Sequence, residues 1–229
     1  MYDTIIIIPY RNRKQHLVYF LNHTWPLLKK HMDNIKLVIV EQEEGKLFNR
    51  GKVLNVGFQE YKDQCNYFII HDVDINPKDS ILSYYFKPLQ NQEIRGIYTS
   101  KWKTLGGIVK IKSSDIHHLS GFPNDFWGWG VEDRALYNRA LFYDYNVKRI
   151  VITKTPEEKQ YFHRFYDVKD QKRDSTFGIR TRIEYDMFHT WTRENQQKHI
   201  MKSGLHNLEY RLLKREELDD DIDKLIVSI

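Results

Sequence analysis

The sequence has little of what marks secreted or membrane proteins. Cys65 is the only cysteine among 229 residues, so no disulfide can form within the chain and nothing indicates an oxidising compartment. No apolar run approaches the ~20 residues that cross a bilayer. The first apolar run begins at Ile5, which leaves no room for a leader. We therefore expect a cytoplasmic protein without a membrane span.

The chain also lacks a strong charge of either sign. Its 36 Lys and Arg residues stand against 31 Asp and Glu residues, a net charge of +5. A mixed, solvated surface explains this balance better than a nucleic-acid footprint, and we expect no nucleic-acid partner. The weak positive field suits an anionic ligand such as a nucleoside diphosphate. Repeats and Pro/Gly/Ser linkers are absent from the sequence, so residues 1–229 are predicted to form one domain.

The first third of the chain alternates buried strands with helices. Short apolar runs predict strands at 5–8, 35–40 and 67–71, and helices are predicted at 11–30 and 52–61. This order indicates an α/β fold that begins as a doubly wound, largely parallel sheet. Ligands of such sheets bind beyond the carboxyl ends of the strands, where segments 9–13 and 72–74 fall.

The remaining two thirds are more mixed. Strands are predicted at 106–111, 148–152 and 224–229, and helices at 113–119 and 132–143. Residues 155–176 are polar and lack apolar periodicity, which predicts a long loop.

Asp72-Val73-Asp74 follows an apolar run. Two carboxylates at a strand end can hold a divalent cation, which neutralises a diphosphate leaving group. The alternative is a simple Asx turn that ends the strand.

The segment from Trp127 to Asp133 is the most distinctive in the chain. Glycines beside Trp127 and Trp129 give these bulky side chains a permissive backbone, and Trp129 can stack on a sugar ring and exclude water. Asp133 is the candidate general base, and Glu132 is expected to orient or hydrogen-bond the substrate. The alternatives are core packing of both tryptophans and acidic residues that merely favour a helix N-terminus.

His163 is the one histidine with a usable context. Its neutral imidazole could complete a manganese shell with Asp74, although a lone histidine is more often a surface residue.

Several segments, in order along the chain, resemble the β-1,4-galactosyltransferase family. They are Ile6-Ile-Ile-Pro-Tyr-Arg-Asn-Arg13, Phe48-Asn-Arg-Gly-Lys-Val-Leu-Asn-Val-Gly-Phe58, Asp72-Val-Asp74, Gly106-Gly107, Gly121-Phe-Pro-Asn124, Trp127-Gly-Trp-Gly-Val-Glu-Asp133 and Gly204-Leu-His-Asn-Leu-Glu-Tyr210. The resemblance implies a GT-A fold, a Rossmann-like domain with a mixed, mostly parallel sheet between helices. It also implies a metal-dependent, inverting transfer of a hexose or N-acetylhexosamine from a UDP-sugar to a hydroxyl of a glycan acceptor.

The same resemblance implies roles for individual residues. Asp133 and Glu132 are the catalytic acids, and Asp74, His163 and Gln160 are the expected ligands of Mn²⁺ or another divalent cation. The expected substrate-binding residues are Pro9, Tyr10, Arg11, Arg13, Phe48, Asn49, Arg50, Asp72, Val73, Thr104, Gly107, Trp129, Gly130 and Arg134. The uridine is expected against the first four of these, and Trp129 is expected to close over donor and acceptor.

Four features depart from the family pattern. Thr104 stands where the family usually has a tyrosine that crowds the 2-position of the sugar, so UDP-GlcNAc or UDP-GalNAc should be used at least as well as UDP-Gal. Arg134 replaces a third acid and indicates a different, anionic acceptor. Gln160 or Tyr161 replaces a methionine or histidine metal ligand. Animal members are commonly Golgi-anchored and disulfide-bonded, and this sequence shows neither feature.

Three other functions remain open from the sequence alone. The chain could be a non-catalytic nucleotide- or carbohydrate-binding module, which the presence of all the acids disfavours. It could be a nucleotidyltransferase or sugar-nucleotide hydrolase, which the tryptophan segment disfavours. A nucleic-acid binder is the most remote.

Overall fold

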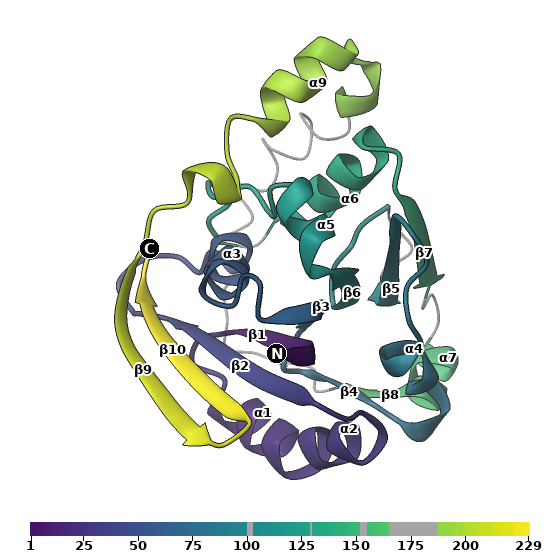
Figure 1. Cartoon of the computed structure of the whole chain (residues 1–229), viewed down its shortest axis with the longest axis vertical. Helices are drawn as coiled ribbons and strands as arrows, with labels where there is room; N and C mark the ends of the chain where they lie inside the picture. Colours follow the sequence, from purple (N-terminus) through teal and green to yellow (C-terminus); the bar gives the residue numbers. More distant parts are fainter. Residues whose placement is uncertain (100–102, 129, 152–154, 165–186) are drawn as a thin grey trace.

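The computed structural model describes the chain outside residues 100–102, 129, 152–154 and 165–186. Its centre is an eight-stranded sheet in the order β7-β5-β6-β3-β1-β2-β10-β9 (Figure 1). The strands of this sheet are β1 (Tyr2–Tyr10), β2 (Ile35–Gln42), β3 (Cys65–His71), β5 (Glu93–Thr99), β6 (Ile108–Lys112), β7 (Asn146–Val151), β9 (Arg211–Asp219) and β10 (Ile222–Ser228). A separate two-stranded sheet joins β4 (Ile75–Pro77) to β8 (Phe162–Arg164).

The large sheet is mixed. Its parallel pairings are β1 with β2, β1 with β3, β2 with β10, and β5 with β7. The antiparallel pairings are β3 with β6, β5 with β6, and β9 with β10. The expectation of a mixed, mostly parallel sheet is therefore confirmed. Because β10 lies beside β2, the last strand of the chain shares this sheet with the first.

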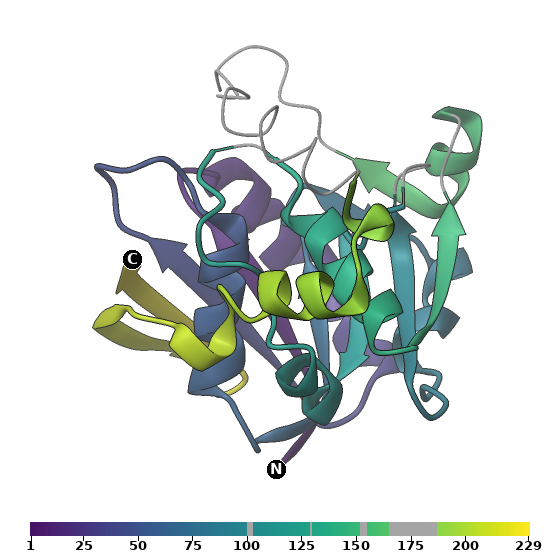
Figure 2. The ribbon, with the colours of Figure 1, turned by 90° about the horizontal axis from the view of Figure 1, so that it is seen from above.

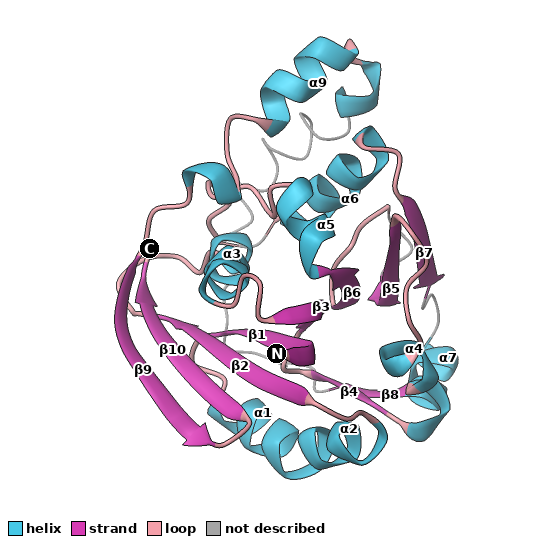
Figure 3. Cartoon of the chain, viewed as in Figure 1, coloured by secondary structure: helices cyan, strands magenta, loops and turns pink. Residues whose placement is uncertain are grey.

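Helices cover both faces of the sheet (Figure 3). The α-helices among the described residues are α1 (Lys14–Tyr19), α2 (Trp25–His31), α3 (Arg50–Glu60), α4 (Ser83–Phe86), α5 (Ser113–His118), α6 (Glu132–Phe142), α7 (Thr155–Tyr161) and α9 (Arg193–Ile200). Successive side chains of a strand point to opposite faces. Ile5 and Ile7 of β1 accordingly join the core under α3, α5 and α6, whereas Ile6 and Ile8 join the core under α1 and α2. Helix α9 packs beside α6 through Phe142, Phe188 and Ile200 (Figures 1 and 2).

The helix predicted at 11–30 is interrupted. A π-helical turn, η1 (Phe20–Thr24), separates α1 from α2. Pro26 has no N–H to donate, and it stands in the first turn of α2, where a helix needs no such donor. The interruption lets the chain accommodate the proline and keeps Phe20, Trp25 and Leu28 buried.

The loop predicted at 155–176 is wrong over its first part. Residues 155–164 form α7 and β8, and β8 pairs with β4 across a gap of some 85 residues in sequence, with Asn76 opposite His163. Such a short strand carries no periodic signal of its own. Residues 165–176 of that prediction lie outside the described residues. The sequence analysis also missed β5, α9 and β9.

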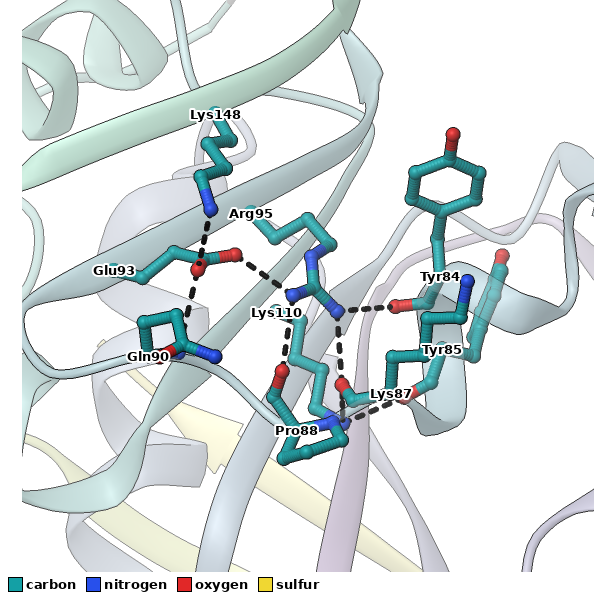
Figure 4. Close-up of polar contacts among 9 residues, drawn as sticks. All are labelled: Tyr84, Tyr85, Lys87, Pro88, Gln90, Glu93, Arg95, Lys110 and Lys148. Atoms are coloured by element: carbon teal, nitrogen blue, oxygen red, sulfur yellow. Dashed lines mark hydrogen bonds and ion pairs between the residues drawn. The ribbon is translucent and has the colours of Figure 1, made fainter.

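A buried charge cluster fastens α4 to the sheet (Figure 4). Lys110 of β6 is fully buried, and its Nζ donates to the carbonyl oxygens of Tyr85 at 2.7 Å and Lys87 at 3.1 Å. Arg95 donates to the carbonyl of Lys87 at 2.8 Å and to the carboxylate of Glu93 at 2.7 Å. These cations satisfy carbonyls that the end of a short helix leaves without partners. Burial lowers the pKa of Lys110 to about 8.

Candidate active site

Two segments of the predicted site begin at the carboxyl ends of neighbouring strands of the sheet. Strands β1 and β3 are parallel neighbours, with Ile7 opposite Ile70. Pro9 and Tyr10 end β1, and Asp72 follows β3 directly. Their positions match the expectation that the site lies beyond the carboxyl ends of the strands. Val73 is buried in the turn after β3.

Arg11 follows β1 and reaches across to the loop before α3. Its guanidinium lies 5.2 Å from the ring centroid of Phe48, and Nη1 donates to the carbonyl of Lys46 at 2.5 Å. This contact orders the segment expected to hold the uridine.

Arg50 joins the two carboxylate motifs, which lie 60 residues apart in sequence. Its Nε and Nη2 lie 2.9 and 2.8 Å from Asp72 Oδ1, and Nη1 lies 3.5 Å from Glu132 Oε1. All three side chains are largely buried, with 14% of Arg50 exposed. Burial alone would lower the pKa of Arg50, but Asp72 and Glu132 outweigh it and raise that pKa. The sequence singled out Arg50 as a substrate-binding residue and did not reveal this bridge.

The glycine pair before β6 brings the same motifs together a second time. A Cβ added to Gly106 would lie 2.7 Å from Asp133 Oδ2, so only glycine leaves room for this carboxylate. Gly107, at φ +75°, accepts the N–H of Asp72 at 3.0 Å through its carbonyl. The backbone of Leu105 donates to the carbonyl of Asp133 at 2.9 Å. Thr104, one residue earlier, is buried beside them.

Glu132 and Asp133 begin helix α6. Burial raises the pKa of Glu132 to about 8, and the neighbouring Asp133 adds to the rise. Burial also raises the pKa of Asp133, although Arg50 opposes the effect. Asp133 Oδ1 accepts the N–H of Arg134 at 2.8 Å, and the side chain of Arg134 is half-buried. The two acids therefore titrate closer to neutral pH than exposed carboxylates do.

The tryptophan segment is described on both sides of Trp129, which itself lies outside the described residues. The N–H of Gly128, at φ +84°, donates to the carbonyl of Phe48 at 2.8 Å. Trp127 packs partly against the core, and Gly130 accepts the N–H of Glu132 at 2.8 Å. The segment is thus anchored at the start of α3 and at the start of α6.

Helix α3 also begins on a residue of the predicted site. The side chain of Asn49 caps the helix by accepting the N–H of Lys52 at 2.9 Å, and its Nδ2 donates to the carbonyl of Asn124 at 2.7 Å. Asn49 therefore has a structural role that the sequence analysis did not assign to it.

The expected metal ligands come from neighbouring elements. Asp74 precedes β4, and β8 carries His163 opposite Asn76, two residues further along. The ring of His163 stacks on Tyr19 with centroids 5.4 Å apart. Gln160 is exposed near the end of α7. Within the described ranges, no three His, Cys, Asp or Glu side chains converge as a metal site.

The electrostatics at Asp74 favour a cation nonetheless. Burial raises the pKa of Asp74, and the carboxylate of Asp72 adds to the rise, whereas Arg164 and Arg13 oppose it. Arg164 Nε lies 4.0 Å from Asp74 Oδ2. Two close carboxylates in this setting fit a hard divalent cation. Arg164, which also donates to Tyr98 Oη at 2.7 Å, is a member of the site that the sequence analysis missed.

Comparison with known families agrees with this geometry. Residues 1–87 match the family model for the N-terminal region of glycosyl transferase group 7, and residues 92–164 match the model for the N-terminal domain of galactosyltransferase. The chain belongs to the β-1,4-galactosyltransferase family. Two relatives illustrate the likeness. Human β-1,4-galactosyltransferase 4 is 28% identical over 218 residues, and bovine β-1,4-galactosyltransferase 1 is 34% identical over 151 residues.

These alignments cover unequal shares of the proteins. The first covers 92% of this chain and 59% of the human relative, and the second covers 63% of this chain and 38% of the bovine one. The chain thus spans less than two thirds of the length of these curated relatives.

A solved structure supports the fold. The galactosyltransferase 7 mutant from Drosophila, in complex with manganese, UDP-Gal and xylobiose, superposes with a TM-score of 0.78 at 24% identity. The superposition covers 100% of this chain and 94% of the other. The expected GT-A fold is confirmed.

The expectation of a cytoplasmic location is wrong. It relied on the missing leader and the single cysteine, yet the sequence matches only 59% of the length of relatives from a family whose animal members are commonly Golgi-anchored. Where this sequence begins therefore says nothing about its compartment. In the described part of the chain, none of the helices has the length and apolarity to cross a bilayer.

Proposed function

We propose that this chain transfers a hexose or N-acetylhexosamine from a UDP-sugar to a hydroxyl of a glycan or glycoconjugate, with inversion and with Asp133 as the general base. One observation carries the proposal. Arg50 and the Gly106-Gly107 pair hold the turn that contains Asp72 and the acids of α6 in a single site, at the sheet edge where this fold binds its ligands. We also propose that residues 1–229 act as one catalytic domain.

Asp133 suits the role of a base. A buried carboxylate with a raised pKa accepts a proton more readily than an exposed one, and it can do so at neutral pH if it lies within hydrogen-bond reach of the hydroxyl. Glu132, with a pKa near 8, is largely protonated at pH 7 and can donate a hydrogen bond to the acceptor. The two neighbours would then orient and deprotonate the same hydroxyl.

The chain offers ligands for Mn²⁺ or another divalent cation. Asp74 and His163 would hold the ion, with Gln160 as the proposed third side chain. When bound, the ion would neutralise the diphosphate of the departing UDP. The side chains of Arg11 and Arg13 supply further positive charge beside the nucleotide.

Thr104 narrows the choice of donor sugar, and Arg134 narrows the choice of acceptor. Thr104 is smaller than the tyrosine usual in the family. We therefore propose that a 2-acetamido group fits beside it and that UDP-GlcNAc or UDP-GalNAc is a donor at least as good as UDP-Gal. Arg134 presents a cation one residue after the base, which favours an acceptor with a carboxylate or phosphate group. The proposed closing role of Trp129 rests on the sequence alone.

The experiment compares wild type with Asp133→Asn. UDP release is measured with Mn²⁺ over a panel of UDP-sugars and of neutral and anionic sugar acceptors, and UDP binding is measured separately by calorimetry. We expect release that requires metal, donor and acceptor, and a loss of about 10²–10⁴-fold in kcat for the variant with UDP binding retained. UDP binding without turnover under every condition would instead favour a non-catalytic binding module.

A further inference from the structure

Strand β9 forms one edge of the large sheet and is open to solvent (Figure 1). Eight of its nine residues are exposed, including Leu212, Leu213 and Leu218 at 36%, 41% and 49%. In the described part of the chain, β10 is the only strand that pairs with it. Its outer row of N–H and C=O groups is therefore available to another strand.

The sequence of β9, Arg-Leu-Leu-Lys-Arg-Glu-Glu-Leu-Asp, is complementary to its own reverse at most of its positions. Lys214 already forms an ion pair with Glu216 of its own strand. An antiparallel copy centred on Arg215 sets Lys214 opposite Glu216 of the copy as well, and Arg211 opposite Asp219. The same register sets Leu212 opposite Leu218, and it sets Leu213 opposite Glu217, which is the one mismatched pair apart from Arg215 with itself. Opposite charges and paired leucines across two strands both stabilise a sheet.

The faces of the strand agree with this register. The four charged residues Arg211, Lys214, Glu216 and Asp219 pair with Ser228, Ile226, Lys224 and Ile222 of β10, which alternate along that strand. All four therefore lie on one face of the sheet, and a two-fold axis perpendicular to the sheet keeps that face continuous. The register with β10 shifts at the two ends of the run 214–217, so the central part of β9 is regular.

Two copies of Arg215 would meet at the axis. Each is already neutralised within its own chain, because Arg215 Nη2 lies 2.6 Å from Glu60 and its guanidinium lies over the ring of Tyr61 at 5.3 Å. The two arginines therefore do not meet as uncompensated positive charges.

We propose that the outer edge of β9 is a homodimer interface, in which a second copy of this chain pairs antiparallel about Arg215 and the two eight-stranded sheets become continuous. Charges on an edge strand often serve to prevent such pairing. A strand protected against its own copy would carry like charges at mirrored positions, whereas β9 carries opposite charges at the two mirrored pairs on either side of the central Arg215. This inference does not depend on the proposed enzymatic activity.

Sedimentation equilibrium tests the proposal with two charge reversals. Wild type should dimerise with a dissociation constant on the order of 10 µM, because the interface is small and largely polar. Lys214→Glu and Glu216→Lys should each weaken the dimer by about tenfold or more, since each creates two repulsive contacts. An equimolar mixture of the two variants should restore it, because every crossed contact is again attractive. Lys198→Glu, on the exposed face of α9, is the matched control and should change nothing.

Disulfide trapping tests the register itself. Cys65 is buried, so a new surface cysteine reacts alone. Leu212→Cys mixed with Leu218→Cys should cross-link under mild oxidation, whereas either variant alone should not, because the two copies of one position lie far apart along the strands. A monomer at concentrations up to about 0.1 mM would overturn the proposal. A dimer that both reversals leave intact, or that fails to recover in the mixture, would overturn it as well.

Discussion

Arg50 should contribute more to the free energy of unfolding than an ordinary surface arginine does, because it lies between carboxylates that are themselves largely buried. In Arg50→Met, Asp72 loses contacts at 2.8 and 2.9 Å and Glu132 loses one at 3.5 Å. Removal of one partner from a buried ion pair costs about 3–5 kcal/mol, since the remaining charge stays uncompensated. We expect a loss of this size in the free energy of unfolding at pH 8.

The loss should shrink as the pH falls. Arg50 opposes the rise that burial causes in the pKa of Asp133, so without the guanidinium that pKa rises further and Asp133 of the folded variant binds more protons than in folded wild type. Each unit by which the pKa of Asp133 rises corresponds to about 1.4 kcal/mol, so protonation of Asp133 as the pH falls recovers part of the difference. The destabilisation should therefore be clearly smaller at pH 5 than at pH 8.

Chemical denaturation at the two pH values measures this effect. A double-mutant cycle with Asp72→Asn should give a larger coupling to Arg50 than one with Glu132→Gln, because the Asp72 contacts are shorter and Glu132 is partly neutral. Lys198→Met, at an exposed helical site, is the control and should change stability by less than about 0.5 kcal/mol. A loss below about 1 kcal/mol, or an equal loss at both pH values, would refute the reasoning.

Three further outcomes are expected. Thr104→Tyr should shift the ratio of rates with UDP-Gal and UDP-GalNAc toward UDP-Gal, and an unchanged ratio in competition assays would remove Thr104 from the donor pocket. His163→Ala should weaken Mn²⁺ binding by about tenfold or more in calorimetry, and intact affinity would show that His163 is not a ligand. Lys110 has a pKa near 8 when folded and 10.5 when unfolded, so the unfolded state binds more protons between these values and wild-type stability should rise with pH there. Lys110→Met should abolish that rise in denaturation midpoints measured between pH 7.5 and 10, and a rise that persists would contradict the assignment.

The sequence predicted the parts of the fold that carry strong local patterns. The apolar runs at 5–8, 35–40 and 67–71 became β1, β2 and β3, because strands buried on both faces must be continuously apolar. The strand β8 escaped prediction because three residues have no period and its partner β4 is distant in sequence. The exposed and highly charged β9 lacks apolar alternation, so it too was invisible.

The sequence likewise predicted some features of the candidate site and not others. The chemical types at Asp72, Asp74 and Asp133 were evident from the sequence, since carboxylates beside strand ends and glycines are unusual. Their mutual distances were not, because Arg50 is separated from Glu132 by 82 positions and Gly106 reveals its fit to Asp133 only in the folded chain. The sequence supplied the resemblance to a family but not the contacts that make the acids one site.

Helix α3 explains why so much of the site depends on one short segment. Arg50, in its first turn, holds Asp72 and Glu132, while Asn49 caps the same turn and donates to the carbonyl of Asn124. One and a half turns later, the amide of Asn55 bonds both the carbonyl and the N–H of Phe122, at 2.7 and 2.8 Å. Helix α3 thus holds both the acids and the chain just before Trp127, and the Gly106-Gly107 pair adds its own contacts to Asp72 and Asp133. A displacement of α3 would move both together, so damage at its buried face should lower catalysis and loosen the segment before Trp127 at the same time.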